Sequence, residues 1–200
     1  MEANKVEKNN GKEMAVKRSS SAIEVKTMVL IALMAAITCI LGPMSLTIPV
    51  SVVPISLTNL AVYFTVYVLG MKRGTVSYLV YLLLGLVGLP VFSGYTGGAG
   101  KLFGPTGGYL IGFIFMALIC GFFIDKWQTK LYLHVLGMVL GTIVCYIFGT
   151  VWLAIQVHMG FYQALASGVL PFIIGDLVKI VIALLAGPVL RKQLKKAGLN

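Results

Sequence analysis

LYLHVLGMVLGTIVCYIFGTVWLAIQV, from Leu131 to Val157, is a run of 27 residues without an Asp, Glu, Lys or Arg. A helix needs about 20 apolar residues to cross the ~30 Å hydrocarbon core of a bilayer. The whole chain shares this character, because 58% of its residues are hydrophobic and only 11% are charged. A soluble domain averages about 25% charged residues. The stretch therefore predicts a transmembrane helix, and the composition predicts a protein embedded in the lipid bilayer.

Further apolar segments on both sides of this stretch predict more membrane-spanning helices. The six predicted helices run roughly from Thr27 to Leu41, Ile55 to Leu69, Gly74 to Leu89, Gly107 to Ile124, Leu131 to Val157 and Gly168 to Val189. The predicted fold class is an all-α membrane protein, a bundle of six transmembrane helices. Residues 1–26 are polar and mixed in charge, which predicts a disordered cytoplasmic tail. Residues 27–200 then form one transmembrane domain.

The placement of the basic residues predicts the orientation of the chain. Basic residues occur in the N-terminal tail and after the second, fourth and sixth segments, as Lys72 and Arg73, Lys126 and Lys130, and Arg191, Lys192, Lys195 and Lys196. The opposite loops contain only Lys101. By the positive-inside rule both termini are cytoplasmic and the charge-poor loops face outward across the cell membrane. Nucleic acid is not an expected partner, since these charges do not cluster with stacking aromatics on one face.

Two of the outer loops are unusual for simple connections between helices. The segment from Gly88 to Tyr109 holds eight glycines and two prolines, and the loop from Gly42 to Pro54 is proline-rich yet apolar. Connecting loops are normally short, and glycine permits close approach of the backbone. We interpret both loops as ligand covers folded over a binding site. The alternative is a flexible extracellular loop.

Asp176 and Lys179 are the strongest candidates for ligand binding. They are the acid and the base that lie well inside a predicted span, in the sequence FIIGDLVKIVIALLAG. A charge at the centre of a membrane helix costs about 2.5–3.5 kcal/mol, so it usually pairs or faces a polar cavity. A spacing of three residues places both side chains on one helical face. The alternatives are a structural salt bridge or a lysine that extends to the interface.

Neutral polar residues near the outer loops are further candidates. Thr58 and Asn59 open the second segment, and Ser93, Tyr95 and Thr96 lie in the glycine-rich loop. Together they offer hydrogen bonds to a small polar ligand. Each of them alone is equally well explained as a helix cap.

Ala32 and Ala36 in the first segment form a face of small residues, widened by Ala35. Such spacing lets two helices approach closely in lipid. We consider two partners for this face: another helix of the same chain, or another subunit.

Sequence motifs for catalysis, metal binding and nucleotide binding are missing. The GAGK at Gly98 to Lys101 lacks the first glycine of a P-loop and the Ser or Thr that follows its lysine. No nucleophile elbow, HExxH or carboxylate pair occurs, and Cys39, Cys120 and Cys145 show no CxxC spacing. We expect no enzymatic activity, no catalytic residues and no metal site.

Three blocks of the chain closely resemble the BioY family, the biotin-specific S components of energy-coupling factor (ECF) transporters. They are GLPVFSGYTGGAGKLFGPTGGYLIGF at residues 88–113, IPVSVVPISLTNLAV at residues 48–62 and GDLVK at residues 175–179. The resemblance spans nearly the whole chain after about Lys26.

The resemblance implies a membrane subunit that binds biotin from outside with high affinity, under the two outer loops, without a cofactor. It assigns hydrogen bonds to the ligand to Asp176 and Lys179, which suits a ureido ring that offers N–H donors and a carbonyl acceptor. The ligand-binding set expected on this basis comprises Asp176, Lys179, Thr58, Asn59, Ser93, Gly94, Tyr95, Thr96, Gly97 and Tyr109.

The resemblance also implies partners, namely an ECF transmembrane scaffold subunit and two cytoplasmic ATPase subunits. Ala32 and Ala36 match the alanines with which the first helix of the family contacts the scaffold. Three alternatives stay open at this point. They are a proton-coupled secondary transporter that uses Asp176 and Lys179, an S component for another vitamin, and a membrane-embedded enzyme or structural scaffold.

Overall fold

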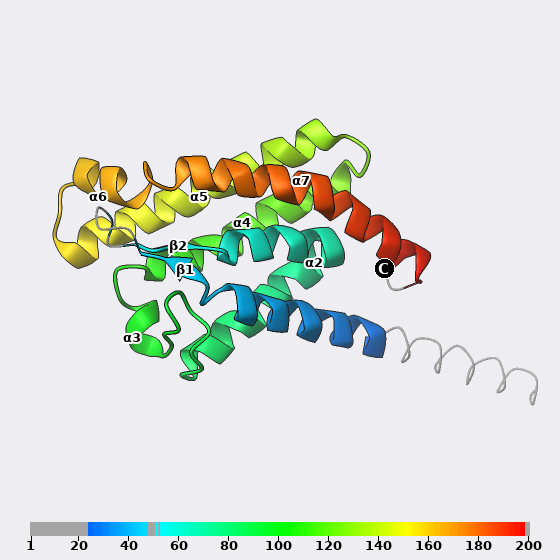
Figure 1. Cartoon of the computed structure of the whole chain (residues 1–200), viewed down its shortest axis with the longest axis horizontal. Coiled ribbons are helices and arrows are strands. Elements are labelled where there is room, and N and C mark those ends of the chain that lie inside the picture. The colour runs from blue at the N-terminus through cyan, green and yellow to red at the C-terminus, as the bar shows by residue number, and fades with distance from the viewer. Residues whose placement is uncertain (1–23, 48–50, 52, 199–200) are drawn as a thin grey trace, which may run out of the picture.

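Long helices that run along one common axis form most of the molecule (Figure 1). The structure, a computed structural model, describes residues 24–47, 51 and 53–198. An N-terminal helix, described over Glu24–Leu41, is followed by β1 (Ser45–Leu46), β2 (Ile55–Ser56), α2 (Thr58–Leu86), α3 (Ala99–Leu102), α4 (Gly107–Lys126), α5 (Leu131–Val157), α6 (Phe161–Gly168) and α7 (Ile173–Lys196). The predicted tail lies outside the described residues up to position 23, and residues 24–26 are helical.

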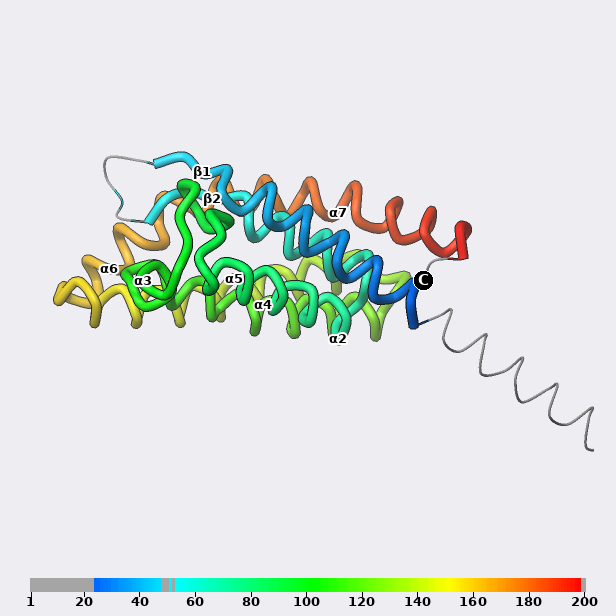
Figure 2. The backbone as a smooth tube through the Cα atoms, turned by 90° about the horizontal axis from the view of Figure 1, so that it is seen from below, coloured from blue at the N-terminus to red at the C-terminus, as the bar shows by residue number. Residues whose placement is uncertain are grey.

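Among the described residues, four helices are long and apolar enough to cross a membrane: the N-terminal helix, α4, α5 and α7. Their bounds agree closely with the predicted segments, except that α7 begins at Ile173 rather than Gly168 and continues to Lys196. The later start follows from α6, a short helix that occupies part of the predicted outer loop and ends at Gly168. In Figure 2 the N-terminal helix and α7 form one layer and α4 and α5 the other. The chain is a multi-pass membrane protein.

The second and third predicted segments are joined in α2, which is kinked at Gly70. Gly70 has φ 77° and ψ −177°, a conformation that interrupts the helix and that residues with a Cβ rarely adopt. The predicted connection at residues 70–73 is therefore wrong in its extent. A single left-handed glycine turns the chain, and Lys72 and Arg73 already lie in the next helical limb.

The carboxylate of Asp125, near the end of α4, holds this kink in place. Its Oδ2 accepts a hydrogen bond from the backbone N–H of Met71 at 2.7 Å, and its Oδ1 accepts one from Nη2 of Arg191 on α7 at 2.8 Å. One side chain thus connects α2, α4 and α7 at the end of the bundle where the helix Glu24–Leu41 begins and α7 ends (Figure 1).

We expect Gly70→Ala to destabilise the protein by about 1–3 kcal/mol, because its backbone conformation is strained for alanine. The added Cβ would also meet Oδ2 of Asp125 at 2.7 Å. Thermal unfolding of the purified protein should show a midpoint lowered by roughly 3–10 °C. Gly175→Ala is the control, since its Cβ meets nothing within 4 Å. Equal midpoints for the two variants would show that the kink is not strained.

A small β-hairpin precedes α2. β1 and β2 pair in antiparallel fashion, Ser45 with Ser56 and Leu46 with Ile55. The fold is mostly helical, as predicted, and this hairpin was not expected because strands of two residues are too short to show an alternating pattern. The hairpin leads directly into α2 and places Ser56 beside the first turn of that helix.

The glycine-rich loop packs tightly against α2 and the first loop. The side chain of Phe92 is fully buried, and a Cβ on Gly85 would come within 2.1 Å of its ring. The hydroxyl of Tyr81 donates a hydrogen bond to the carbonyl of Val91 at 3.0 Å, and the N–H of Gly98 donates one to the carbonyl of Gly85 at 2.7 Å. These contacts fix the loop over the end of the bundle that holds the cavity described next.

Candidate functional site

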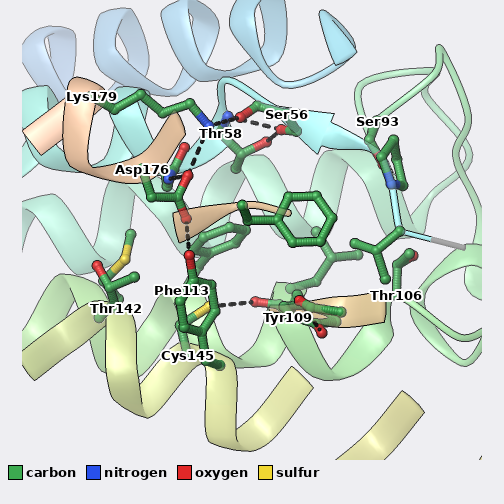
Figure 3. A pocket seen from close by; sticks show the side chains of 18 residues that line it. Ser56, Thr58, Ser93, Thr106, Tyr109, Phe113, Thr142, Cys145, Asp176 and Lys179 are labelled. Atoms are coloured by element: carbon green, nitrogen blue, oxygen red, sulfur yellow. Dashed lines mark hydrogen bonds and ion pairs between the residues drawn. The ribbon is translucent and has the colours of Figure 1, made fainter. Parts of the chain in front are cut away.

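A cavity of about 70 Å³ lies at the hairpin end of the bundle, among α2, α4, α5 and α7 (Figure 3). One buried water requires only roughly 10–15 Å³. Its polar lining consists of Ser56, Thr58, Asn59, Ser93, Thr106, Thr142, Asp176 and Lys179, and its aromatic lining of Tyr109, Phe113, Tyr146 and Phe172. A cavity with a few convergent polar groups and an apolar remainder is the usual form of a small-molecule site.

The carboxylate of Asp176 is the centre of the polar part. Its Oδ1 accepts hydrogen bonds from Nδ2 of Asn59 at 2.7 Å and from Nζ of Lys179 at 3.0 Å. Its Oδ2 accepts one from the hydroxyl of Tyr146 at 2.5 Å. The residue is 8% exposed, so these three donors replace water around a buried charge.

Lys179 connects the helix α7 to the hairpin. Its ammonium group donates a second hydrogen bond, to the carbonyl of Ser56 at 2.7 Å, and the residue is 7% exposed. An ammonium group carries three donors, and its third has no partner among the residues that the structure describes. The ion pair of Lys179 with Asp176 is therefore buried, and the ammonium group keeps one N–H donor for a ligand.

Four residues of α4 form the apolar wall of the cavity. Tyr109, Leu110, Phe113 and Met116 follow one another at positions i, i+1, i+4 and i+7, which places them on one helical face. The hydroxyl of Tyr109 donates to the carbonyl of Gly168 at 2.8 Å. Since that hydroxyl hydrogen is already used, Tyr109 offers the cavity mainly its ring.

The structure brings together six of the ten predicted ligand-binding residues. Asp176, Lys179, Thr58, Asn59, Ser93 and Tyr109 all line the cavity. Gly94, Tyr95, Thr96 and Gly97 do not line it. Tyr95 is 70% exposed, and the Thr96 hydroxyl donates to the carbonyl of Ser93 at 3.0 Å. These four residues lie in the loop that covers the cavity end of the bundle.

Sequence reasoning missed Tyr146, which contacts the central carboxylate. Thr142 and Tyr146 lie four residues apart on α5, and both line the cavity. Their i, i+4 spacing was visible in the sequence, but an uncharged helix offers many such pairs. Among the described residues, no group of three His, Cys, Asp or Glu side chains is arranged to hold a metal ion.

The two alanines of the N-terminal helix lie away from this cavity. Ala32 and Ala36 are exposed on the outward side of the helix, whereas Ala35 is 2% exposed and packs inward. The expectation that Ala35 widens the small face is therefore wrong. Ala32 and Ala36 pack against no other part of the described chain closely enough to be buried, which leaves their face open to a partner.

Comparison with known proteins identifies relatives along most of the chain. Residues 13–196 match the BioY family. The biotin transporter BioY2 of Lactococcus lactis subsp. cremoris is 34% identical over 168 residues, which cover 84% of this chain and 91% of the relative. The biotin transporter BioY of Thermotoga maritima is 40% identical over 147 residues, covering 74% and 86%.

A solved structure supports the same relationship. The crystal structure at 2.1 Å of the S-component for biotin from an ECF-type ABC transporter superposes on this chain with a TM-score of 0.79. The two are 34% identical in sequence, and the match covers 84% of this chain and 92% of the solved one.

Proposed function

Because this chain belongs to the BioY family, we propose that its cavity binds biotin through Asp176 and Lys179. The chain is the biotin-binding S component of an ECF-type transporter. It acts in transport rather than in catalysis, and biotin is its transported ligand rather than a cofactor.

The observation that carries the assignment of the site is the buried pair of Asp176 and Lys179 at the edge of an apolar cavity. The ureido ring of biotin offers two N–H donors and one carbonyl acceptor, which match a carboxylate and an ammonium group 3.0 Å apart. The thioether ring and the alkyl chain of biotin are apolar and match the wall formed by Phe113 and Met116. Charge-assisted bonds then fix the ring orientation, while burial of the apolar part supplies affinity.

The remaining predicted residues divide into two groups by position. Thr58, Asn59, Ser93 and Tyr109 line the cavity and are proposed to contact the ligand. Gly94, Tyr95, Thr96 and Gly97 belong to the covering loop, and we propose that they act on the ligand only through closure of that loop. Asn59 has a further role, because its amide holds Oδ1 of Asp176.

The proposed membrane topology has six crossings, with the two limbs of α2 as the second and third. The kink at Gly70 lies beside the last turns of α7, because Asp125 accepts hydrogen bonds from both Met71 and Arg191. The described chain begins and ends at this end of the bundle (Figure 2). Lys72, Arg73 and the basic turn of α7 lie there as well, so the positive-inside rule places this end in the cytoplasm. The cavity, at the other end, then opens outward from the cell membrane.

Membership in the family implies an ECF module as partner. We propose that this module consists of one membrane scaffold subunit and two ATPases, and that the scaffold meets the exposed face of Ala32 and Ala36. ATP hydrolysis by the module would supply the energy for uptake. Binding of biotin to Asp176 and Lys179 would need no ATP.

The test is calorimetric titration of the purified protein, without ATP, with biotin, thiamine, riboflavin and pantothenate. We expect saturable heat with biotin at micromolar or lower concentration and none with the other three. Saturable binding of another vitamin, with no heat from biotin, would refute the biotin site.

Tyr146→Phe tests the missed residue. The change removes the hydrogen bond to Oδ2 of Asp176 and frees the carboxylate to rotate, so we expect biotin affinity to fall by about 3- to 30-fold. Tyr67→Phe is the matched control, because it also removes one buried hydrogen bond, with Nδ1 of His134 at 3.2 Å, and Tyr67 does not line the cavity that Asp176 lines. A loss of affinity in both variants would indicate a general packing effect rather than orientation of Asp176.

A further inference from the structure

A second cavity lies at the opposite end of the bundle, between the end of α7 and the connection from α4 to α5. It has a volume of about 490 Å³, and its lining includes Gln128, His134, Arg191, Lys192, Lys195 and Lys196. Four of these side chains are cationic, and among the residues that the structure describes none with a carboxylate belongs to the lining. Nothing in the proposed binding of biotin uses this cavity, which lies about three helical turns further along α7, from Lys179 of the first cavity to Arg191 of the second.

The basic residues of α7 are arranged on one face and not merely concentrated at its end. Positions 191, 192, 195 and 196 fall within about 140° of a helix with 3.6 residues per turn. Orientation in the membrane requires basic residues near the helix end, but it does not require them on one face. All four basic residues line the second cavity, so the face that they share is the one next to it.

Only part of this charge is neutralised among the described residues. Arg191 pairs with Asp125 at 2.8 Å, and Nζ of Lys195 donates to the amide oxygen of Gln128 at 2.8 Å. Nε of Arg191 is buried and has no hydrogen-bond partner within the described chain. The helix C-terminus adds roughly −0.5 of an elementary charge, which is small beside the cations. The cavity is therefore suited to an anion.

The surface of α7 below the cavity indicates the source of that anion. Val181, Leu185 and Val189 are 54%, 70% and 57% exposed, and they continue in line into Lys192 and Lys196. These five positions lie within about 80° on the helix. The apolar residues match the acyl chain of a lipid, and the two lysines at their end match its phosphate. Free phosphate would contact the lysines but not the apolar residues.

We propose that this second cavity binds the phosphate of an anionic phospholipid, with an acyl chain along Val181, Leu185 and Val189. Juxtamembrane basic residues attract anionic lipid headgroups. The bound lipid ties α7 to the connection between α4 and α5, at the end of the bundle opposite the biotin cavity.

The experiment measures the thermal unfolding of the full chain in a neutral detergent. Dioctanoyl phosphatidylglycerol should raise the midpoint by about 5–10 °C at a hundredfold excess over its Kd. Dioctanoyl phosphatidylcholine and inorganic phosphate at the same concentration should raise it by less than a third as much. Equal stabilisation by inorganic phosphate would overturn the lipid assignment, and equal stabilisation by phosphatidylcholine would overturn the role of the cations.

Two double variants with the same change in charge localise the effect. Lys192→Gln with Lys196→Gln should abolish the shift caused by phosphatidylglycerol. Lys72→Gln with Arg73→Gln, exposed residues at the same end of the bundle, should keep it. If the first pair fails to fold, Lys192→Arg with Lys196→Arg replaces it and should keep the shift. Loss in the control pair, or retention in the first pair, would refute the site.

Discussion

Asp176→Asn is expected to weaken biotin binding by about 10- to 1,000-fold. A hydrogen bond to a charged group contributes about 1.5–3 kcal/mol, and the variant loses the carboxylate proposed to accept hydrogen bonds from the ureido N–H groups. It also leaves the ammonium group of Lys179, now held by the carbonyl of Ser56, without a buried counter-charge. Calorimetric titration of the purified variant with biotin measures the change.

The control for this change is Asp125→Asn at the other end of the bundle. Asp125 is also paired with a cation, Arg191 at 2.8 Å, but it holds the kink of α2 and not the cavity. We expect it to lower thermal stability and to leave biotin affinity within about threefold. Wild-type affinity in a folded Asp176→Asn variant would place the site elsewhere.

Lys179→Met examines whether the two charges act as a unit. It should weaken binding to a similar extent, because the carboxylate of Asp176 then loses one of its donors. The two side chains touch at 3.0 Å, so the double variant should lose less affinity than the sum of the single losses. Additive losses would mean that each residue contacts the ligand independently.

The features that could be located from the sequence share one physical property, a large free energy of transfer between water and lipid. Charges within an apolar span are expensive, so Asp176 and Lys179 were conspicuous, and the structure pairs them as their spacing predicts. A run of about 20 apolar residues is typical of a membrane-spanning helix. Accordingly, α4 and α5 begin at the predicted residues.

The features that it missed depend on contacts between distant segments. Tyr146 meets Asp176 across 30 residues of sequence, and Lys179 meets the carbonyl of Ser56 across 123. Every residue has a backbone carbonyl, so the sequence does not show that the one of Ser56 binds Lys179. A tyrosine in a membrane helix usually lies at the lipid interface, so Tyr146 did not indicate a contact with Asp176. A connection at residues 70–73 was predicted, but not that Gly70 alone makes the turn, because its contact with the distant Asp125 is not visible in the sequence.

Ala36→Trp is expected to leave biotin binding unchanged and to reduce uptake at least tenfold. Ala36 is exposed on the outward face of the N-terminal helix, which does not line the cavity, and a bulky ring there prevents close approach of another helix. Uptake into liposomes that contain the ECF module measures the effect, with Ile155→Trp, exposed by 64% on α5, as the control. Full uptake by the Ala36 variant would exclude this face as the docking surface. In a separate experiment without the ECF module, proton-driven accumulation by the wild-type chain would favour a secondary transporter. Ala32→Trp, one helical turn away on the same face, should behave as Ala36→Trp does, because both rings would separate the same two helices.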